Sequence, residues 1–307
     1  MAPAMSSLIV EDLLTLILVT SPVPSNPSTE MIERTLRSYT EAGDLTTCTK
    51  IIVSDGCYAA APGQREKQKH GRVPAEWIEP YAKYRDRLDQ LISATAMQDQ
   101  PSVDELADAG NVSSSLAAAA AKVGGAPYFA FCRHLRMERH VGFGACIAAA
   151  LRLTSTPYIL VIQHDRPCLR SVDTRGILLA MQASEGAIKY IGLPTKASLA
   201  RVAPEHVQMR CGIRLTGHDL DPQVEQATAF AGVRLCPLLF WYDSTHFSLA
   251  SHYRDFVFAK GRVTGAGFPE DSLGQEMHAE ICSAAKQDGD WCKVHARYGT
   301  YLLLDDA

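Results

Sequence analysis

The length and composition of the chain are those of an ordinary globular protein. Its 307 residues suffice for one large domain or two small ones, and 47% of them are hydrophobic while 21% are charged. A formal net charge of −4 argues against a nucleic-acid partner, which would need clustered lysines and arginines. The nine cysteines include no C-x-x-C pair and indicate no disulfide scaffold, and Cys282, Cys292 and His295 fit no usual zinc spacing.

The apolar stretch near the N-terminus does not predict a membrane span. Residues 8–19 are mostly apolar, but Glu11 and Asp12 interrupt them and leave a run too short to cross a bilayer. No basic segment or small-residue cleavage pattern accompanies the run. We therefore expect a cytoplasmic protein without a membrane-spanning segment.

The first predicted elements are a strand, a helix and a second strand. Residues 13–19 and 49–55 are short apolar runs typical of buried parallel strands. Between them, Asn26 and Pro27 predict the start of a helix and Gly43 predicts its end. Such a βαβ crossover is nearly always right-handed.

Farther along, the pattern is interrupted once and then resumes. A helix with a break at Pro80 is expected over residues 75–97, and the Ala-, Ser-, Gly- and Asp-rich residues 98–127 predict a mobile surface insertion. The remaining elements alternate, which predicts an α/β fold with a mostly parallel central sheet and helices on both faces. Strands are expected at 128–135, 158–165, 188–194, within 232–247 and at 295–306, and helices at 141–154, 174–184, 251–258 and 268–286.

Polar residues follow three of the predicted strands, at 20–24, 54–56 and 163–165. Ligands of open α/β sheets bind at the carboxyl ends of the strands, so we expect Asp55 and Asp165 at one crevice. Mg²⁺ and Mn²⁺ take one or two protein carboxylates there and complete their coordination with phosphate oxygens and water. Either acid could instead cap a turn or a helix, as an Asp-Gly pair often does.

Four segments occur in an order that resembles a known enzyme family. They read "TLILVTSPVPSNPSTEMIERTLRS", "IIVSDG", "HVGFGACIAAALRLTSTPYILVIQHD" and "FPEDSLGQEM". Their order and spacing are similar to those of nucleotide-sugar-dependent glycosyltransferases of the GT-A fold, closest in layout to the large inverting family 2. The resemblance omits about residues 60–127. It implies a single GT-A-like domain over 1–307, with a nucleotide-sugar-binding half at 13–170 and an acceptor half at 171–307.

In the first half, the resemblance implies a binding site for the nucleotide. Backbone groups after the first strand would hold the base, and the acid after the second strand would bind the base or the ribose. Arginines that precede the helix at 141–154 could meet the diphosphate, although a solvated basic face is an equal alternative. The residues concerned are Thr20, Ser21, Pro22, Asp55, Arg136 and Arg139.

The metal site implied by the resemblance follows the strand at 158–165. The last acid of the family's Asp-x-Asp motif corresponds to Asp165, which would bind the Mn²⁺ or Mg²⁺ that bridges the diphosphate. Gln163 replaces the first acid of the motif, so it can hydrogen-bond the ribose but adds no charge, and His164 occupies the variable middle position. His295 resembles a C-terminal histidine that closes on the metal in some of these enzymes.

The catalytic base implied by the resemblance is an acid at the start of a late helix. Asp271 matches best and Glu270 precedes it, although Pro-Glu-Asp is also ordinary chemistry for a helix start. A base is needed because the acceptor hydroxyl loses a proton as it attacks the anomeric carbon. Acceptor contacts are expected from Trp241, Asp243 and His246, unless these belong to a packed core strand.

The leading hypothesis is therefore an inverting, metal-dependent transferase that uses a UDP-, GDP- or dTDP-sugar and a sugar or glycan acceptor. One alternative is a sugar-phosphate nucleotidyltransferase, but "TSPVPSNPS" after the first strand lacks the expected Gly and Lys. Another is a degenerate nucleotide-sugar-binding module without catalysis, which Gln163 favours. The chain has no G-x-G-x-x-G after its first strand, which argues against a nicotinamide enzyme.

Overall fold

The computed structural model describes residues 8–43, 45–98, 126–215, 220–263, 267–287 and 290–304. They belong to two compact units: an N-terminal unit of residues 9–153 and 163–172, and a C-terminal unit of residues 1–8, 154–162 and 173–307. Residues 99–125 of the predicted insertion lie outside the described residues. Within the described part of the chain, every helix is too short or too polar to cross a membrane.

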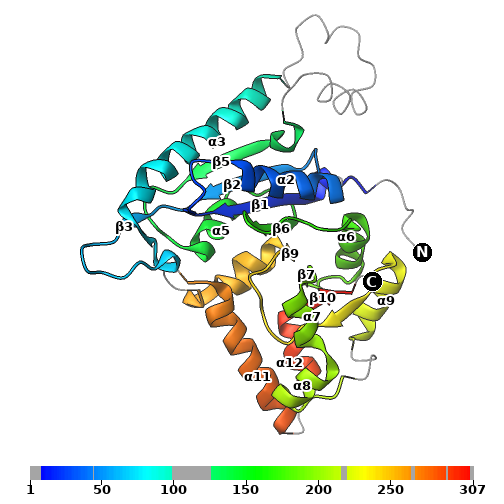
Figure 1. Ribbon diagram of the computed structural model, residues 1–307. Coiled ribbons are helices and arrows are strands. Elements are labelled where there is room, and N and C mark those ends of the chain that lie inside the picture. Colours follow the sequence, from blue (N-terminus) through cyan, green and yellow to red (C-terminus); the bar gives the residue numbers. More distant parts are fainter. Residues whose placement is uncertain are drawn as a thin grey trace, which may run out of the picture. The chain divides into compact units, whose positions relative to one another are not determined.

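Three parallel strands form the centre of the N-terminal unit. The middle strand β2 (Thr49–Ser54) pairs with β1 (Leu14–Thr20) on one side and with β5 (Cys132–Arg136) on the other. Every residue of β1 is buried, and successive side chains point to opposite faces, so both faces of the strand are covered. The helices around these strands are α2 (Glu30–Gly43), α3 (Ile78–Gln98) and α5 (Phe143–Leu151) (Figure 1).

Two predicted features of these helices are wrong for local reasons. α2 begins at Glu30, because Asn26 instead closes a turn by accepting a hydrogen bond from the Val23 N–H at 2.8 Å. α3 passes through Pro80 without a break, because Pro80 lies in the first turn, where its missing N–H forfeits no helical hydrogen bond. The shorter elements of the unit are α1 (Val10–Leu13), β3 (Tyr58–Ala59), β4 (Arg72–Val73), η1 (Gln68–His70), η2 (Ala75–Trp77) and η3 (Pro127–Phe129).

The C-terminal unit contains the strand order β6-β9-β7-β10-β8. β9 runs antiparallel to both β6 and β7, while β10 is parallel to β7 and antiparallel to β8. β6, β7 and β10 therefore share one direction. Most strands of each unit share one direction, and β8 and β9 are the strands that pair antiparallel in this unit. This arrangement confirms the predicted α/β class. The bounds are β6 (Tyr158–Gln163), β7 (Tyr190–Gly192), β8 (Leu235–Pro237), β9 (His246–Leu249) and β10 (Thr300–Leu303).

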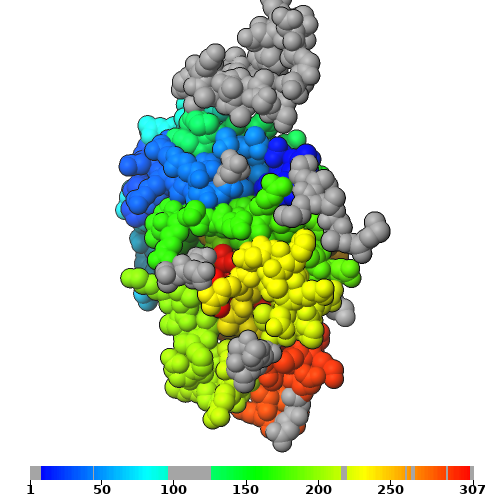
Figure 2. Space-filling view, turned by 90° about the vertical axis from the view of Figure 1, so that its right-hand side faces the viewer, coloured from blue at the N-terminus to red at the C-terminus, as the bar shows by residue number. Residues whose placement is uncertain are grey.

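Helices of the C-terminal unit cover these strands, and several of them were not predicted. Figure 2 shows α9 in yellow and α7 and α8 in yellow-green at the surface of this unit. The predicted helix at 268–286 starts as a π-helical turn, η6, and the predicted strand at 295–306 is a helix as far as Tyr298. The bounds are α6 (Thr174–Ala183), α7 (Lys196–Val202), α8 (Pro204–Cys211), α9 (Pro222–Ala231), α10 (Ala250–His252), η4 (Tyr253–Val257), η5 (Ala259–Gly261), η6 (Glu270–Gly274), α11 (Gln275–Lys286) and α12 (Trp291–Tyr298).

Two glycines of the N-terminal unit let the loop before α5 lie close to neighbouring backbone. A Cβ atom on Gly56, directly beyond β2, would overlap the backbone of Arg139. A Cβ atom on Gly71 would overlap the ring of His140, and Gly71 also has a φ of +71°, which disfavours other residues. The loop is thus positioned by the absence of two side chains.

We expect Gly56→Ala to lower the free energy of unfolding by roughly 3 kcal/mol or more, because backbone atoms cannot move aside as a flexible side chain would. Gly232→Ala is the matched control, since Gly232 has open space around it and a φ of +72°. The control should lose only about 1 kcal/mol from backbone strain. Urea unfolding of both variants measures the difference, and equal losses would contradict the proposed overlap.

Candidate functional site

Asp55 is the most extensively bonded candidate at the strand ends of the N-terminal unit. It directly follows β2 and is only 4% exposed. Its carboxylate accepts hydrogen bonds from the backbone N–H groups of Gly56 at 2.9 Å, Val141 at 2.8 Å and Gly142 at 3.0 Å. The Nδ1 atom of His140 lies 2.8 Å from the Asp55 Oδ2 atom. Asp55 therefore holds the loop before α5 against the end of β2.

These contacts bear on the predicted role of Asp55 in binding a nucleotide. An ionised carboxylate offers about four acceptor positions, and four groups of the chain already occupy them. A direct contact with a nucleobase or ribose stays a prediction, and it requires one of these groups to give way. The sequence indicated the position of this acid but contained no sign of the backbone donors around it.

The turn after β6 contains a histidine held by backbone hydrogen bonds, followed by an exposed acid. The backbone N–H of His164 donates to the Val19 carbonyl at 3.2 Å, and the His164 carbonyl accepts from the Thr35 hydroxyl at 2.7 Å. Burial lowers the pKa of His164 although Asp165 lies nearby, so the ring is neutral at neutral pH. Asp165 is exposed, and its carboxylate is open to a ligand from solvent, while Gln163 ends the strand.

The segment predicted to hold the base starts at the end of β1. Thr20 is buried, and its hydroxyl lies 3.0 Å from the Tyr84 hydroxyl, while its carbonyl accepts from the Asp55 N–H at 2.9 Å. Ser21 is exposed and Pro22 is buried. The ends of β1 and β2 and the turn after β6 therefore lie side by side within this unit.

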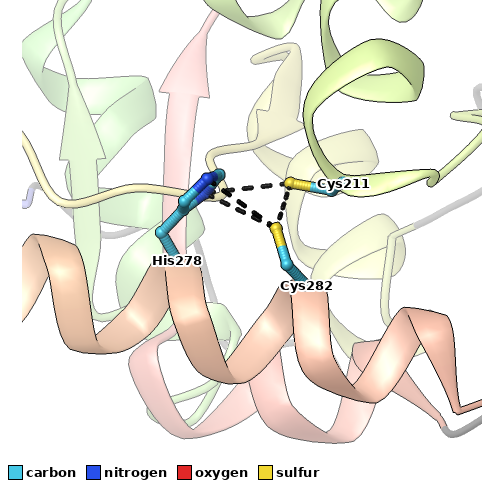
Figure 3. Close-up of side chains that lie close together, drawn as sticks. All are labelled: Cys211, His278 and Cys282. Carbon is cyan, nitrogen blue, oxygen red and sulfur yellow. Dashed lines mark hydrogen bonds between the residues drawn. The ribbon is translucent and has the colours of Figure 1, made fainter.

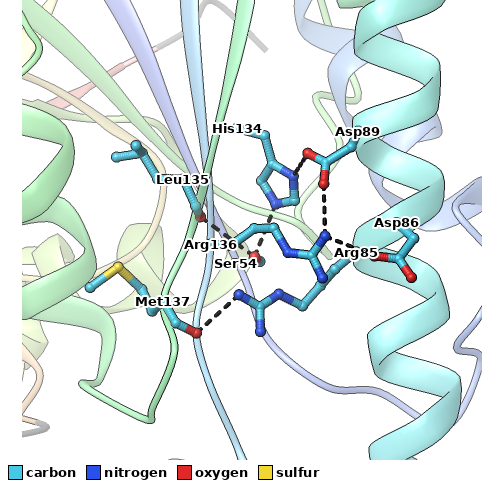
Figure 4. Close-up of polar contacts among 8 residues, drawn as sticks. All are labelled: Ser54, Arg85, Asp86, Asp89, His134, Leu135, Arg136 and Met137. Carbon is cyan, nitrogen blue, oxygen red and sulfur yellow. Dashed lines mark hydrogen bonds and ion pairs between the residues drawn. The ribbon is translucent and has the colours of Figure 1, made fainter.

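Arg136, a candidate for the diphosphate, is engaged by two acids of α3 (Figure 4). Its Nη1 atom lies 2.8 Å from Asp86 Oδ1 and 2.8 Å from Asp89 Oδ2. A phosphate would have to compete with both carboxylates for this guanidinium. Arg139, the second candidate, is exposed, and its contact with a phosphate likewise stays a prediction.

Figure 4 also shows a Ser-His-Asp arrangement, in the geometry that hydrolases use for a nucleophile. The Ser54 Oγ atom lies 2.9 Å from His134 Nε2, and His134 Nδ1 lies 2.6 Å from Asp89 Oδ1. Ser54 is 0% exposed, however, so no substrate carbonyl can reach its hydroxyl. Burial acts to raise the pKa of Asp89, but hydrogen bonds from His134 and Arg136 outweigh it and lower that pKa. The trio is a structural link between α3 and the strands β2 and β5.

The loop between β8 and β9 in the C-terminal unit is packed through a cluster of buried aromatic rings. Trp241 and His246 are both 0% exposed. The His246 ring stacks on Tyr190, its Nε2 atom lies 2.8 Å from the Tyr253 hydroxyl, and burial lowers its pKa to about 4. Neither side chain offers surface to an acceptor in this conformation. Acceptor contact by Trp241 or His246 stays a prediction that requires the loop to open.

Asp243 and Glu270 join this loop to the start of the late helix by reciprocal hydrogen bonds. The Asp243 Oδ2 atom accepts from the Glu270 N–H at 2.9 Å, and the Glu270 Oε2 atom accepts from the Asp243 N–H at 3.2 Å. Asp243 is 3% exposed, and burial raises its pKa to about 8, with a further rise from the charge of Glu270. A buried acid with a pKa near neutrality is typical of functional sites. The sequence indicated Asp243 only as an acceptor contact.

Two further candidates of this unit differ in accessibility. Asp271 follows Glu270 in η6 and is exposed, as a base that meets a substrate must be. His295 on α12 is only 4% exposed, its Nε2 atom lies 2.8 Å from the Thr300 carbonyl, and burial lowers its pKa to about 4. A metal contact by His295 requires that hydrogen bond to break, and it stays a prediction.

Each unit thus assembles part of the predicted site. The N-terminal unit brings together the strand ends that carry Asp55 and Asp165, and the C-terminal unit brings Asp243 beside Glu270 and Asp271. The predicted meeting of Asp55, Asp165 and Asp271 around one cleft involves both units and stays a prediction.

Comparisons with known proteins report structural likeness alone. No protein-family model matches the chain. No curated protein matches it either. Sixty solved chains match its structure. One is TarS of S. aureus, with 12% identity and a TM-score of 0.29 over 60% of this chain and 22% of TarS.

A second match is glucosyl-3-phosphoglycerate synthase of Mycobacterium tuberculosis, in a complex with Mg²⁺ and uridine diphosphate. It has 9% identity and a TM-score of 0.32 over 79% of this chain and 58% of that chain. Another structure of the synthase gives 10% identity and a TM-score of 0.31, with the same coverage. The chain spans 22% of TarS and 58% of the synthase. At TM-scores this low, the likeness assigns no function and no residue role to this chain.

We expect Asp55→Asn to lower the free energy of unfolding by roughly 2 kcal/mol, because an amide NH₂ would face N–H groups and leave donors unpaired. The control is Asp290→Asn, since Asp290 caps α12 from an exposed position where asparagine serves equally well. Urea unfolding measures both variants. Equal stability of the Asp55→Asn variant and the wild type would show that the carboxylate does not hold the loop.

The raised pKa of Asp243 makes stability depend on pH. Between its ordinary pKa of 3.8 and its folded value of about 8, the folded chain keeps a proton that the unfolded chain releases. Rising pH therefore favours unfolding, by at most about 1.4 kcal/mol per pH unit. Asp243→Asn removes this dependence, so its stability relative to wild type should increase from about pH 5 to about pH 8. Parallel pH curves from urea unfolding of the two proteins would contradict the shift.

Proposed function

We propose that the chain is a glycosyltransferase that moves a sugar from a nucleotide diphosphate sugar to an acceptor hydroxyl. The observation that carries the proposal is the set of polar groups at the strand ends of the N-terminal unit. The Nε2 atoms of His140 and His164 are buried there without a hydrogen-bond partner among the described residues. Buried polar atoms normally have partners, and a nucleotide that binds with a local opening of this region would supply partners for these two.

The residues after β6 fit a divalent cation that binds together with the donor diphosphate. Mg²⁺ usually takes only one or two protein carboxylates and fills its coordination with phosphates and water. Asp165 supplies one exposed carboxylate, and Gln163, two residues earlier in the chain, has a neutral amide oxygen. When bound, the cation would neutralise charge that develops on the departing diphosphate. The donor would be a UDP-, GDP- or dTDP-sugar.

Asp271 is the proposed catalytic base, and Glu270 and Asp243 position the turn that carries it. Asp271 is exposed, whereas its neighbour Glu270 is held by the two reciprocal bonds to Asp243. In an inverting reaction, Asp271 would take the proton from the acceptor hydroxyl as that oxygen attacks the anomeric carbon. The proposal requires Asp165 and Asp271 to face the same bound sugar.

A non-catalytic nucleotide-sugar-binding module is the second candidate function. Gln163 lacks the charge of an acid, and Arg136 is already paired with Asp86 and Asp89. Both features reduce the charge available to stabilise a departing diphosphate, so they favour binding without transfer.

A donor screen with UDP-, GDP- and dTDP-sugars, Mg²⁺ or Mn²⁺ and glycan acceptors tests the proposal by nucleoside diphosphate release. We expect Asp165→Ala and Asp271→Ala each to lower kcat/KM at least about 100-fold, because each removes a group that acts in the transition state. Asp12→Ala, which removes an exposed acid from α1, is the control and should keep full activity.

Calorimetry separates the two candidate functions. For a transferase, Asp271→Ala should bind the nucleotide as wild type does while it loses turnover, and the product should have the inverted anomeric configuration. Nucleotide binding without turnover for every acceptor would support the binding module. Failure of wild type to bind any nucleotide would contradict both functions.

A further inference from the structure

Cys211, His278 and Cys282, none of which is a residue of the proposed site, form a compact group in the C-terminal unit (Figure 3). The His278 Nδ1 atom lies 3.7 Å from the Cys211 Sγ atom and 3.8 Å from the Cys282 Sγ atom. The two sulfur atoms lie 2.6 Å apart. Among the described residues, this is the group in which at least three potential metal ligands lie within 4.8 Å of one another.

Two helices bring these side chains together. His278 and Cys282 are four residues apart on α11, so they lie on the same face of the helix, one turn apart. Cys211 is the last residue of α8, and Gly212 ends that helix in the left-handed conformation with a φ of +72°. Helical ligands spaced by four residues are a known way to bind one metal ion. The group therefore has a two-point platform on α11 and a third ligand from α8.

The separations suit a tetrahedral zinc ion in two of three cases. Zn–S bonds of about 2.3 Å and Zn–N bonds of about 2.0–2.1 Å place a sulfur and a nitrogen ligand about 3.6 Å apart, and two sulfur ligands about 3.8 Å apart. The distances from His278 Nδ1 to the two sulfur atoms, 3.7 and 3.8 Å, agree with this geometry. The Cys282 Sγ atom also lies 3.7 Å from His278 Nε2, so the ring must turn to direct Nδ1 at a shared ion. The two thiols, which lie 2.6 Å apart, must separate by about 1.2 Å.

The surroundings of the group are also those of a metal site. Cys211 is 2% exposed and Cys282 is 9% exposed, and both are free thiols. The His278 ring hydrogen-bonds to the Leu239 backbone and meets the Phe240 ring edge-on, contacts that orient an imidazole ligand. His278 is only partly buried, which leaves one side of the group open to solvent. Thiolate and imidazole ligands together favour zinc over harder cations such as Mg²⁺.

We propose that Cys211, His278 and Cys282 bind one zinc ion, with a water molecule from the open side as the fourth ligand. The placement of His278 at nearly equal distances from both sulfur atoms favours a shared cation over a simple thiol pair. The ion would join α8 to α11, the helix that continues from the turn containing Glu270 and Asp271. This site does not depend on the proposed transferase function.

Titration of the reduced, metal-free full chain with Zn²⁺ alone, and with Co²⁺ as a spectroscopic probe, tests the proposal. We expect one ion per chain, a tetrahedral Co²⁺ spectrum with a thiolate charge-transfer band, and a higher Tm with zinc. Cys211→Ser, Cys282→Ser and His278→Ala should each lose stoichiometric binding and the zinc-dependent rise in Tm. Cys292→Ser is the matched control, because Cys292 is exposed on α12 outside the group, and it should bind as wild type does.

Three outcomes would overturn the site. They are no zinc uptake by the reduced wild type, equal zinc binding by wild type and Cys282→Ser, and a Cys211–Cys282 disulfide in peptide maps of a chain that takes up no zinc once reduced. If the serine variants do not fold by circular dichroism, His278→Ala decides, because it keeps both thiols. If the His278→Ala variant has a native circular dichroism spectrum but lacks the tetrahedral Co²⁺ spectrum, the result supports the zinc site. If its Co²⁺ spectrum equals that of the wild type, the result overturns the site.

Discussion

The buried carboxylate of Asp55 is the interaction on which the N-terminal unit depends most. Moving a charged carboxylate out of water is costly unless donors replace the water, and here three backbone N–H groups and His140 do so. All of these donors except the Gly56 N–H come from the loop before α5, so one side chain orders the end of β2 and the start of that helix. Gly56 and Gly71 permit the approach because they carry no side chain. The strand-end surface that would meet a nucleotide is built on this arrangement.

Asp243 is a buried carboxyl group whose hydrogen bonds do not make up for the water it has lost. The Glu270 N–H donates to it, yet burial dominates and the pKa rises to about 8. The protonated acid can stay in the core of the C-terminal unit and fix the loop to the late helix. Asp271, the residue after Glu270, remains exposed. Asp243 is buried and can only position the turn, whereas Asp271 is exposed and can meet a substrate.

Much of the fold could be predicted where the signal is local. β1, β2, β6 and α6 follow from short apolar runs. In the structure, Asp173 also caps α6, and its carboxylate accepts a hydrogen bond from the Gly176 N–H. α7, α8, α9 and α12 were not predicted, because they are short helices and helices of this length are stabilised mainly by packing against their neighbours. The start of α2 was predicted wrongly because the Asn26 side chain accepts a hydrogen bond from Val23, which precedes it, and does not cap the helix. The capping pattern in the sequence does not reveal this.

The sequence by itself determined the residue types that end the strands and begin the late helix: Asp55 after β2, Asp165 after β6, and Glu270 with Asp271 at η6. Only the tertiary structure decided that Asp55 is surrounded by donors, that Trp241 and His246 are buried, and that Cys211 meets His278 and Cys282. The reason is that apolar runs and caps act over a few residues. The contacts that saturate Asp55 or gather the thiols join positions 86 and 71 residues apart, and only packing brings such positions together.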